Sequence, residues 1–162
     1  MTAVDVGVLT IRKAVIRDAD TIQKMVNRLA EQGSMLAIAL SDIFEHIRDF
    51  WVVEKGGEVV GTCALHVIWE DLGEIRSLAV DPCCRDLGVG RVLVEKCLEE
   101  AAGLHLLRIF ALTYQEEFFR HMGFDVVDKE RLPHKVWRDC MKCTKFPNCD
   151  ETAVMKVLEE EQ

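Results

Sequence analysis

The sequence predicts an α+β or α/β sandwich built around a mostly antiparallel sheet. Short runs of strand-forming residues alternate with amphipathic segments, and Gly56-Gly57 separates two of these runs as in a β-hairpin. The 162 residues are 49% hydrophobic and 30% charged, which is typical of one globular domain with its own core. We therefore expect a single domain over residues 1–162, with residues 159–162 as a solvated acidic tail.

The N-terminal half combines strand-like runs with two helices. Apolar residues recur at i, i+3, i+4 and i+7 from Ile22, which indicates an amphipathic helix. Asp18 is placed to cap this helix and Gly33 to end it, and Ser41-Asp42 offers a cap for a second, shorter helix. The elements expected here are a strand over residues 8–15, a helix before Gly33, a short helix through Ile47, and strands over residues 50–54 and 58–69.

The C-terminal half alternates strands and helices more regularly. Asp81-Pro82 closes one strand-like run, and Gly103 ends a long amphipathic helix. The elements expected here are strands over residues 74–80, 106–114, 124–127 and 152–158, and helices over residues 89–102 and 115–122.

Charge and composition exclude several classes of protein. The formal net charge is -8 and the isoelectric point about 5.1, so no general field attracts nucleic acid or an anionic membrane. The longest uncharged runs, residues 34–41 and 61–69, are far shorter than the roughly 20 residues of a membrane helix. The N-terminus lacks a signal-peptide pattern, and the seven cysteines do not suggest a secreted disulfide framework. We expect a cytoplasmic protein with reduced thiols.

The most specific local feature is the R-x-x-G-x-G run from Arg85 to Gly90, followed by Arg91. It joins a strand to a helix, where backbone N–H groups and the positive helix end form an anion site suited to a diphosphate. A P-loop pattern is absent, and Leu93 occupies the third glycine position of a dinucleotide fingerprint. A purely structural turn with a helix cap is the alternative.

Together with four longer segments, this glycine run makes the chain resemble the GNAT family of acetyl-CoA-dependent N-acetyltransferases. The resemblance runs through FWVVEKGGEVVGTCAL, EIRSLAVDPCCRDLGVGRVLVEKCLEEA, RIFALTY and EEFFRHMGF. Within the family, GEIRSLAV, LTYQEEFFRHMGF and LPHKVW are similar to amino-acid N-acetyltransferases of the N-acetylglutamate synthase type, in a short form without an amino-acid-kinase domain. This implies helices on both faces of the sheet, acetyl-CoA as co-substrate and no metal in the chemistry.

The resemblance also implies where the donor binds. The pantetheine arm would pair with the backbone of Leu78, Ala79 and Val80, much as an added strand would, while the Leu78 and Val80 side chains belong to the core. The diphosphate would lie on the glycine loop, formed by Arg85, Asp86, Leu87, Gly88, Val89, Gly90 and Arg91.

Acetyl transfer needs a base, an oxyanion donor and an acid for the leaving thiolate. Glu74 matches the family's base, with an exposed strand-start carboxylate as the alternative. Strand alternation puts Arg76 on the same side, where it would either pair with Glu74 or hold a substrate carboxylate. The oxyanion donor would be a backbone N–H near Leu78, if the strand carries the family's bulge. Phe119 occupies the position of the family's tyrosine acid, so Tyr114 is the candidate acid, unless it only packs.

The expected acceptor is a small amino acid, with L-glutamate and arginine biosynthesis as the first hypothesis. The segment 134–146 is basic, and Lys135 with Arg76 would bind carboxylates. Against glutamate, the loop Leu36-Ala37-Ile38-Ala39 lacks the arginine that such synthases commonly present. Two alternative functions stay open, a protein or peptide N-acetyltransferase and a non-catalytic acetyl-CoA sensor. A homodimer is also compatible with the sequence.

The same basic segment contains a possible metal-binding pattern. Cys140, Cys143 and Cys149, with His134 upstream, have the donor types of a structural zinc site. A single C-x-x-C without a second pair is equally compatible with plain thiols, and the catalytic chemistry calls for no metal.

Overall fold

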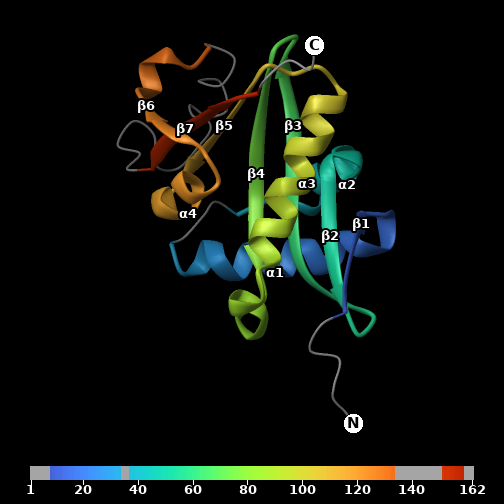
Figure 1. Cartoon of the computed structure of the whole chain (residues 1–162). Helices are drawn as coiled ribbons and strands as arrows, with labels where there is room; N and C mark the ends of the chain where they lie inside the picture. Colours follow the sequence, from blue (N-terminus) through green and yellow to red (C-terminus); the bar gives the residue numbers. More distant parts are fainter. Residues whose placement is uncertain (1–7, 34–36, 134–150, 159–162) are drawn as a thin grey trace. The chain divides into compact units, whose positions relative to one another are not determined.

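The computed structural model describes residues 8–33, 37–133 and 151–158. These form a seven-stranded sheet of order β1-β2-β3-β4-β5-β7-β6, in which β4 and β5 run parallel and the other registered neighbours run antiparallel (Figure 1). The strands are β1 (Leu9–Lys13), β2 (Phe50–Lys55), β3 (Glu58–Trp69), β4 (Leu72–Val80), β5 (Arg108–Thr113), β6 (Asp125–Val127) and β7 (Thr152–Val157). The α-helices are α1 (Ala19–Glu31), α2 (Leu40–Glu45), α3 (Val89–Gly103) and α4 (Glu116–His121).

Contacts divide the chain into two compact units. The first comprises Met1–Leu65 and Ser77–Glu99, and the second comprises His66–Arg76 and Glu100–Gln162. The boundaries fall inside β3, β4 and α3, so three continuous elements belong to both units.

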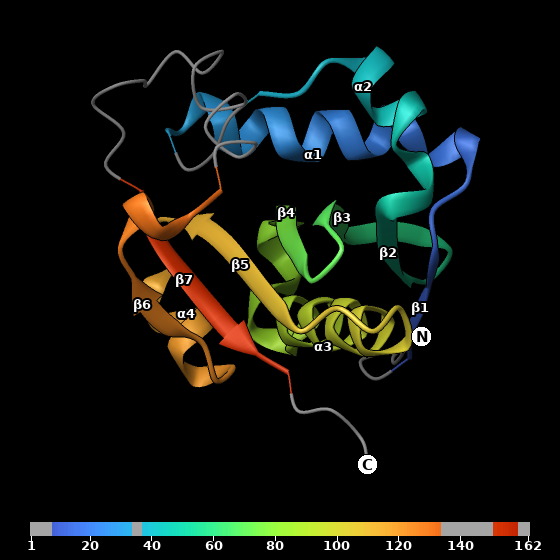
Figure 2. The ribbon, with the colours of Figure 1, turned by 90° about the horizontal axis from the view of Figure 1, so that it is seen from above.

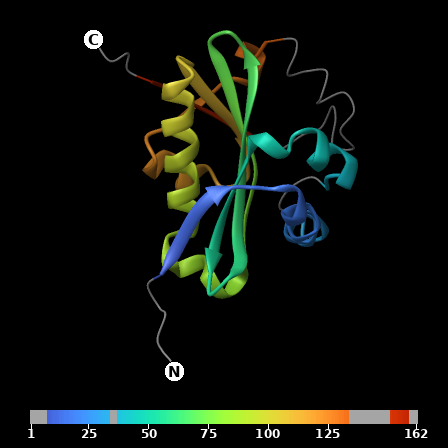
Figure 3. The same ribbon diagram turned by 90° about the vertical axis from the view of Figure 1, so that its right-hand side faces the viewer.

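The first unit has helices on both faces of its strands. Figure 3 shows α3 on one side of β1, β2 and β3, and α1 with α2 on the other. The apolar stripe of α1 supplies Ile22 and Val26, which pack with Ile43 of α2 and Val52 of β2 in one buried cluster. This burial of one helix face is what the i, i+3, i+4 spacing predicts.

The second unit contains β5, β7 and β6 side by side, with α4 in contact with β6 and β7 (Figure 2). Phe110 and Ala153 are buried in a cluster with Leu72 at the start of β4. Phe119 of α4 is also buried, and its ring meets Phe118 and Phe124 edge-to-face, with centroids 5.2 and 5.1 Å away. Phe119 is therefore a core aromatic residue.

Two predicted helix caps are wrong. Asp18 makes no cap hydrogen bond to α1, because its carboxylate accepts from Arg12 and from the Val15 N–H instead. The short helix begins one residue before Ser41, and Ala39 is its N-cap residue. The Gly56-Gly57 hairpin and the order of strands and helices are confirmed. None of the described helices is long and apolar enough to cross a membrane.

Candidate functional site

The strand β4 changes its backbone direction at Ser77. This residue has a φ of 55°, a left-handed conformation that is rare outside glycine and marks an interruption of regular strand geometry. Side-chain burial also differs on the two sides of Ser77. Every residue from Leu72 to Ile75 is buried, whereas Ala79 is the only buried residue of β4 after Ser77. The prediction that Leu78 and Val80 are core residues is therefore wrong, because both are half-buried.

The parallel pairing of β4 with β5 is short. Its register extends from Leu72↔Arg108 to Glu74↔Phe110, whereas β5 continues beside β7 as far as Thr113. Residues 75–80 of β4 therefore lie beyond the registered pairs with β5. Main-chain N–H and C=O groups that a neighbouring strand leaves unpaired can form hydrogen bonds with an extended ligand.

Glu74 occupies the last paired position of β4. Only 6% of its surface is exposed, so the alternative of an exposed strand-start carboxylate is wrong. Arg76 Nε donates a hydrogen bond to Glu74 Oε1, so the expected pairing of the two side chains is present, and the second role expected for Arg76, contact with a substrate carboxylate, stays a prediction. The contact with the guanidinium holds the buried carboxylate at a defined position, and its role as a base stays a prediction.

Tyr114 directly follows β5 and is half-buried. The turn that carries it is held by Thr113, whose Oγ1 accepts a hydrogen bond of 2.7 Å from the Gln115 N–H. This contact fixes the chain between β5 and α4, because the Thr113 side chain is itself buried. The candidate acid therefore lies on a constrained bend.

The predicted glycine loop begins with a 3-10 helix, Pro82–Leu87, that the sequence did not indicate. Asp81 caps it by accepting a hydrogen bond of 3.1 Å from the Cys83 N–H, and the Asp81 N–H donates to the Val60 carbonyl at 2.8 Å. The hydrogen bonds to Cys83, above all that of its thiol, lower the pKa of Asp81. The Asp81 carboxylate thus caps the 3-10 helix, and the Asp81 main chain ties the loop to β3.

Gly88 joins this short helix to α3. Its φ is 76°, which glycine adopts without the steric penalty of other residues. The Val92 N–H donates to the Gly88 carbonyl at 3.1 Å, so the amides of Val89, Gly90 and Arg91 precede the first hydrogen bond of α3 and have no partner within it. These amides and the helix dipole form a site for an anion.

Side chains around this turn divide into anchors and exposed charges. Val89 is fully buried, while Leu87 is half-buried. Arg85, Asp86 and Arg91 are exposed, and Arg91 Nε donates to Glu95 at 2.9 Å. Residues 85–91 thus run from the end of the 3-10 helix through Gly88 into the first turn of α3, and their binding of a diphosphate stays a prediction.

The loop between α1 and α2 is fastened by two contacts that the sequence did not reveal. The Ile38 N–H donates to Asn27 Oδ1 at 3.0 Å, and Gln23 Nε2 donates to the Ile38 carbonyl at 3.4 Å. Ala37 and Ala39 on either side are exposed. The described residues of this loop, 37–39, are all uncharged.

Two predicted groups lie outside the described residues. One is Lys135, the candidate contact for a substrate carboxylate. The other is the set of possible metal donors, His134, Cys140, Cys143 and Cys149.

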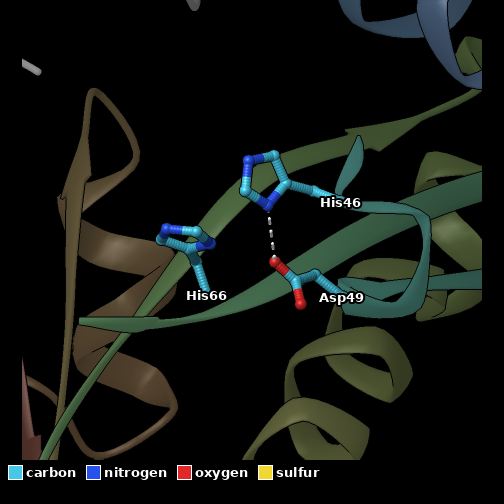
Figure 4. A group of neighbouring side chains, drawn as sticks. All are labelled: His46, Asp49 and His66. Atoms are coloured by element: carbon cyan, nitrogen blue, oxygen red, sulfur yellow. Dashed lines mark ion pairs between the residues drawn. The ribbon is translucent and has the colours of Figure 1, made fainter. Parts of the chain in front are cut away.

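One histidine has a partner that its sequence context did not suggest. His46 Nδ1 lies 3.6 Å from Asp49 Oδ2, three residues later, and Figure 4 shows the two side chains facing each other. The third residue drawn, His66, comes from β3. The His46–Asp49 pair closes the turn between α2 and β2.

Comparisons with known proteins show which family the chain is similar to. The Acetyltransferase (GNAT) family matches residues 21–124. An uncharacterized N-acetyltransferase of Chlorobaculum tepidum is 41% identical over 91% of this chain and 96% of its own length. The amino-acid acetyltransferase of Mycobacterium tuberculosis is 40% identical over 73% of this chain and 69% of its own.

A solved structure extends the likeness to the fold. It is the N-acetylglutamate synthase of Neisseria gonorrhoeae, complexed with coenzyme A and N-acetyl-glutamate, which superimposes with a TM-score of 0.86 at 28% identity. The match covers 94% of this chain and 36% of that one. The expected mixed fold and the expected resemblance are both confirmed, and the chain belongs to the GNAT family of acetyltransferases.

Proposed function

We propose that this enzyme transfers the acetyl group of acetyl-CoA to the amino group of a small amino acid, with L-glutamate as the first candidate. The observation that carries the proposal is the sequence of features along one segment. An interrupted strand at Ser77 leads into the turn at Gly88, where α3 begins with three amides free of helical partners.

This segment suits the two chemically different parts of the donor. The main chain of Leu78, Ala79 and Val80 lies beyond the registered pairs with β5 and offers hydrogen bonds to an amide-containing arm. The turn from Arg85 to Arg91 offers amides and two guanidinium groups to a diphosphate. The family and the structural relative, solved with coenzyme A, support this assignment.

The chemistry needs a neutral amine, and Glu74 is the group that accepts the ammonium proton, directly or through one water. A backbone N–H at Leu78 or Ala79, just after the turn at Ser77, donates to the oxyanion that forms as the amine attacks the thioester. Tyr114 donates the proton that the leaving thiolate takes up. If nothing protonated a thiolate with a pKa of about 8.5 at pH 7, the step would be about 2 kcal/mol less favourable.

Glutamate is supported by the relatives' names and by the positive charge available. The Mycobacterium tuberculosis relative is named an amino-acid acetyltransferase, and the Neisseria gonorrhoeae structure holds N-acetyl-glutamate. Arg76 and Lys135 are the cations proposed for the carboxylates. The uncharged loop around Ile38 leaves these two residues to replace the arginine that synthases present there.

The test is to measure thiol release from acetyl-CoA with each amino acid in turn. We expect turnover with L-glutamate, and a lower kcat/KM with the nearly isosteric L-glutamine, because only glutamate offers a second carboxylate to Lys135 and Arg76. Lys135→Gln should reduce this preference, and Lys55→Gln, on the hairpin of β2, is the control. Turnover with peptides alone, or tight acetyl-CoA binding without turnover of any amine, would contradict the proposal.

A further inference from the structure

Cys83 and Cys84 form a pair of adjacent thiols that the proposed acetyl transfer does not use. Their sulfur atoms lie 3.3 Å apart in the 3-10 helix ahead of the glycine loop. Cys83 is exposed, whereas Cys84 is 1% exposed and ends against the Cys83 sulfur. One sulfur is therefore open to solvent, and the second is within reach of anything bound to the first.

The backbone disfavours a direct disulfide between these residues. Adjacent Cα atoms are about 3.8 Å apart across a trans peptide, while disulfides join Cα atoms about 4.4 to 6.8 Å apart. Both cysteines are free thiols in the structure. The pair is thus suited to a ligand that bridges the sulfur atoms rather than to a bond between them.

The separation of the sulfurs indicates which bridging atom fits. With two bonds of about 2.3 Å, the length of a metal–thiolate bond, a sulfur separation of 3.3 Å corresponds to an angle of about 92° at the bridging atom. A tetrahedral ion with the same bonds would need about 3.8 Å between the sulfurs. A three-coordinate, pyramidal atom with bond angles near 90° matches this separation of the two sulfur atoms.

We propose that Cys83 and Cys84 form a chelating site for trivalent arsenic. In the reaction with arsenous acid, two As–S bonds form and two As–O bonds break. Each thiol proton leaves with a hydroxide as water, and the third hydroxide stays on the arsenic. Arsenic and sulfur keep their oxidation states, so no oxidant or reductant is required.

The state of the Cys83 thiol agrees with this chemistry. Its hydrogen bond to the Asp81 carboxylate, together with the contact to Cys84, raises the pKa of Cys83 to about 11. The thiol is therefore protonated at neutral pH and reacts slowly as a thiolate nucleophile with alkylating agents or peroxides. Condensation with arsenous acid removes that proton as water.

The second close pair of described thiols provides an internal comparison. Cys63 and Cys97 have sulfur atoms 3.8 Å apart, but both are completely buried between β3 and α3. Reagents in solution do not reach them without unfolding. Accessibility therefore assigns the arsenic site to Cys83 and Cys84 rather than to the buried pair.

A bridge at this position should affect the glycine loop. The Cys83 N–H and the Cys84 N–H both donate to Asp81, at 3.1 and 2.9 Å, and Arg85 follows immediately. A bound arsenical adds bulk beside this cap and beside the first arginine of the loop. We therefore expect weaker acetyl-CoA binding when arsenic occupies the site, an expectation that rests on the proposed function.

The test uses phenylarsine oxide, which exchanges its oxygen for two thiols and releases one water. The full chain should carry Cys140→Ser, Cys143→Ser and Cys149→Ser, so that thiols outside the described residues do not react. Trypsin cleavage after Arg76 and Arg85 gives one peptide with both cysteines, and we expect a single phenylarsenic adduct on it. The adduct should survive excess monothiol and be removed by a 1,2-dithiol.

Two variants make the result decisive. Cys83→Ser, at an exposed position, should lower adduct retention by roughly 10²-fold, because a single thiol cannot chelate. Cys97→Ala, which removes the buried pair, should leave retention unchanged, and thermal unfolding shows that both variants are folded. An adduct on another peptide, or one that monothiol removes, overturns the site. A chelated adduct with an unchanged KM for acetyl-CoA keeps the site and overturns its coupling to the loop.

Discussion

Glu74 is nearly inaccessible to solvent, and a carboxylate in such a place is stable in its charged form only with a strong partner. Arg76 provides that partner two residues along the same strand. The next residue, Ser77, has a left-handed backbone conformation, which interrupts the regular geometry of the strand. Residue by residue, β4 therefore places a buried carboxyl group, its guanidinium partner and a left-handed backbone position in close succession.

Glu74→Gln tests the base directly. The amide has nearly the same shape and retains an oxygen for Arg76, but it cannot take up the ammonium proton. We expect kcat to fall by roughly 10²-fold or more at neutral pH, with little change in the KM for acetyl-CoA. The loss should shrink at higher pH, where more of the acceptor amine is already neutral.

Steady-state rates between pH 6 and 9 measure this effect, and the unfolding midpoint of Glu74→Gln shows whether the buried pair still holds the strand. Glu99→Gln, an exposed change on α3 away from the glycine loop, is the matched control. A pH–rate profile identical to that of the unchanged enzyme would remove Glu74 from the mechanism.

Among the elements, α3 depends on a close approach to β3. A Cβ atom added to Gly61 would lie 2.5 Å from Val89 Cγ1 and 3.1 Å from Leu93 Cδ1. Gly61→Ala should therefore destabilise the fold by about 1 to 3 kcal/mol, since overpacking forces the helix start away from the sheet. Val89→Ala removes the nearer atom.

The double variant should consequently lose less stability than the two single variants together. We expect its loss in free energy of unfolding to be about 1 kcal/mol smaller than the sum of the two single losses. Urea unfolding of the four proteins completes the cycle. Additivity within about 0.5 kcal/mol would show that the contact does not limit the position of α3.

The turn at Gly88 gives a second prediction at this scale. A Cβ there meets no atom within 4 Å, so its effect comes from the φ of 76° and from the open space beside the helix amides. Gly88→Val should raise the KM for acetyl-CoA by tenfold or more, which corresponds to a loss of about 1.4 kcal/mol in binding. Gly103→Val, at the other end of α3 and also in open space, is the control.

Direct binding of coenzyme A by calorimetry separates affinity from turnover in this pair. Equal affinities for the Gly88→Val and Gly103→Val proteins would refute the assignment of the diphosphate to this turn.

Elements were predictable where local chemistry decides them. Gly56-Gly57 and Gly88 mark turns in the sequence itself, and the apolar period from Ile22 marks α1. The left-handed backbone of Ser77 has no such signal, because serine is common in regular strands. The half-buried position of Leu78 was likewise beyond a prediction based on strand alternation.

Contacts across long stretches of sequence were equally unpredictable. Asn27 holds Ile38 across 11 residues, and Asp18 gives up its capping role because β1 and β2 bring Arg12 and Glu54 beside it. The burial of Glu74 likewise depends on the pairing of β4 with β5, which is remote in sequence. In each case, the polar side chain of Asn27, Asp18 or Glu74 predicts that a polar contact exists, but the sequence does not indicate which residue provides the other half of the contact.

At the scale of the whole molecule, one charged cluster joins three segments near the start of the chain. Arg12 of β1 donates to both oxygens of Asp18, at 2.7 and 3.0 Å, and to Glu54 of β2 at 2.6 and 2.9 Å. Asp18 also accepts from the Val15 N–H at 2.8 Å, directly before α1. Loss of this cluster would loosen the junction of β1, β2 and α1 together.

The cluster makes stability depend on acid pH, and the direction follows from Asp18. Its hydrogen bond with Arg12, more than any other contact, lowers the pKa of the Asp18 carboxyl in the folded state. The unfolded chain therefore binds a proton first, at about pH 3.9. The stabilisation is complete above that pH and is lost as the pH falls through the lower folded value.

Asp18→Asn should accordingly lower the free energy of unfolding at pH 7 by about 1 to 3 kcal/mol, the value of hydrogen bonds to a charged group. The difference from the unchanged protein should narrow as the pH falls below about 4, because Asp18 then becomes protonated and both proteins carry a neutral side chain there. Asp20→Asn is the matched control, since Asp20 is 65% exposed and pairs only at the surface with Lys24, so its loss should be below about 1 kcal/mol at every pH. Urea unfolding across this range measures both curves, and parallel curves for the unchanged protein and Asp18→Asn would exclude Asp18 as the source of acid sensitivity.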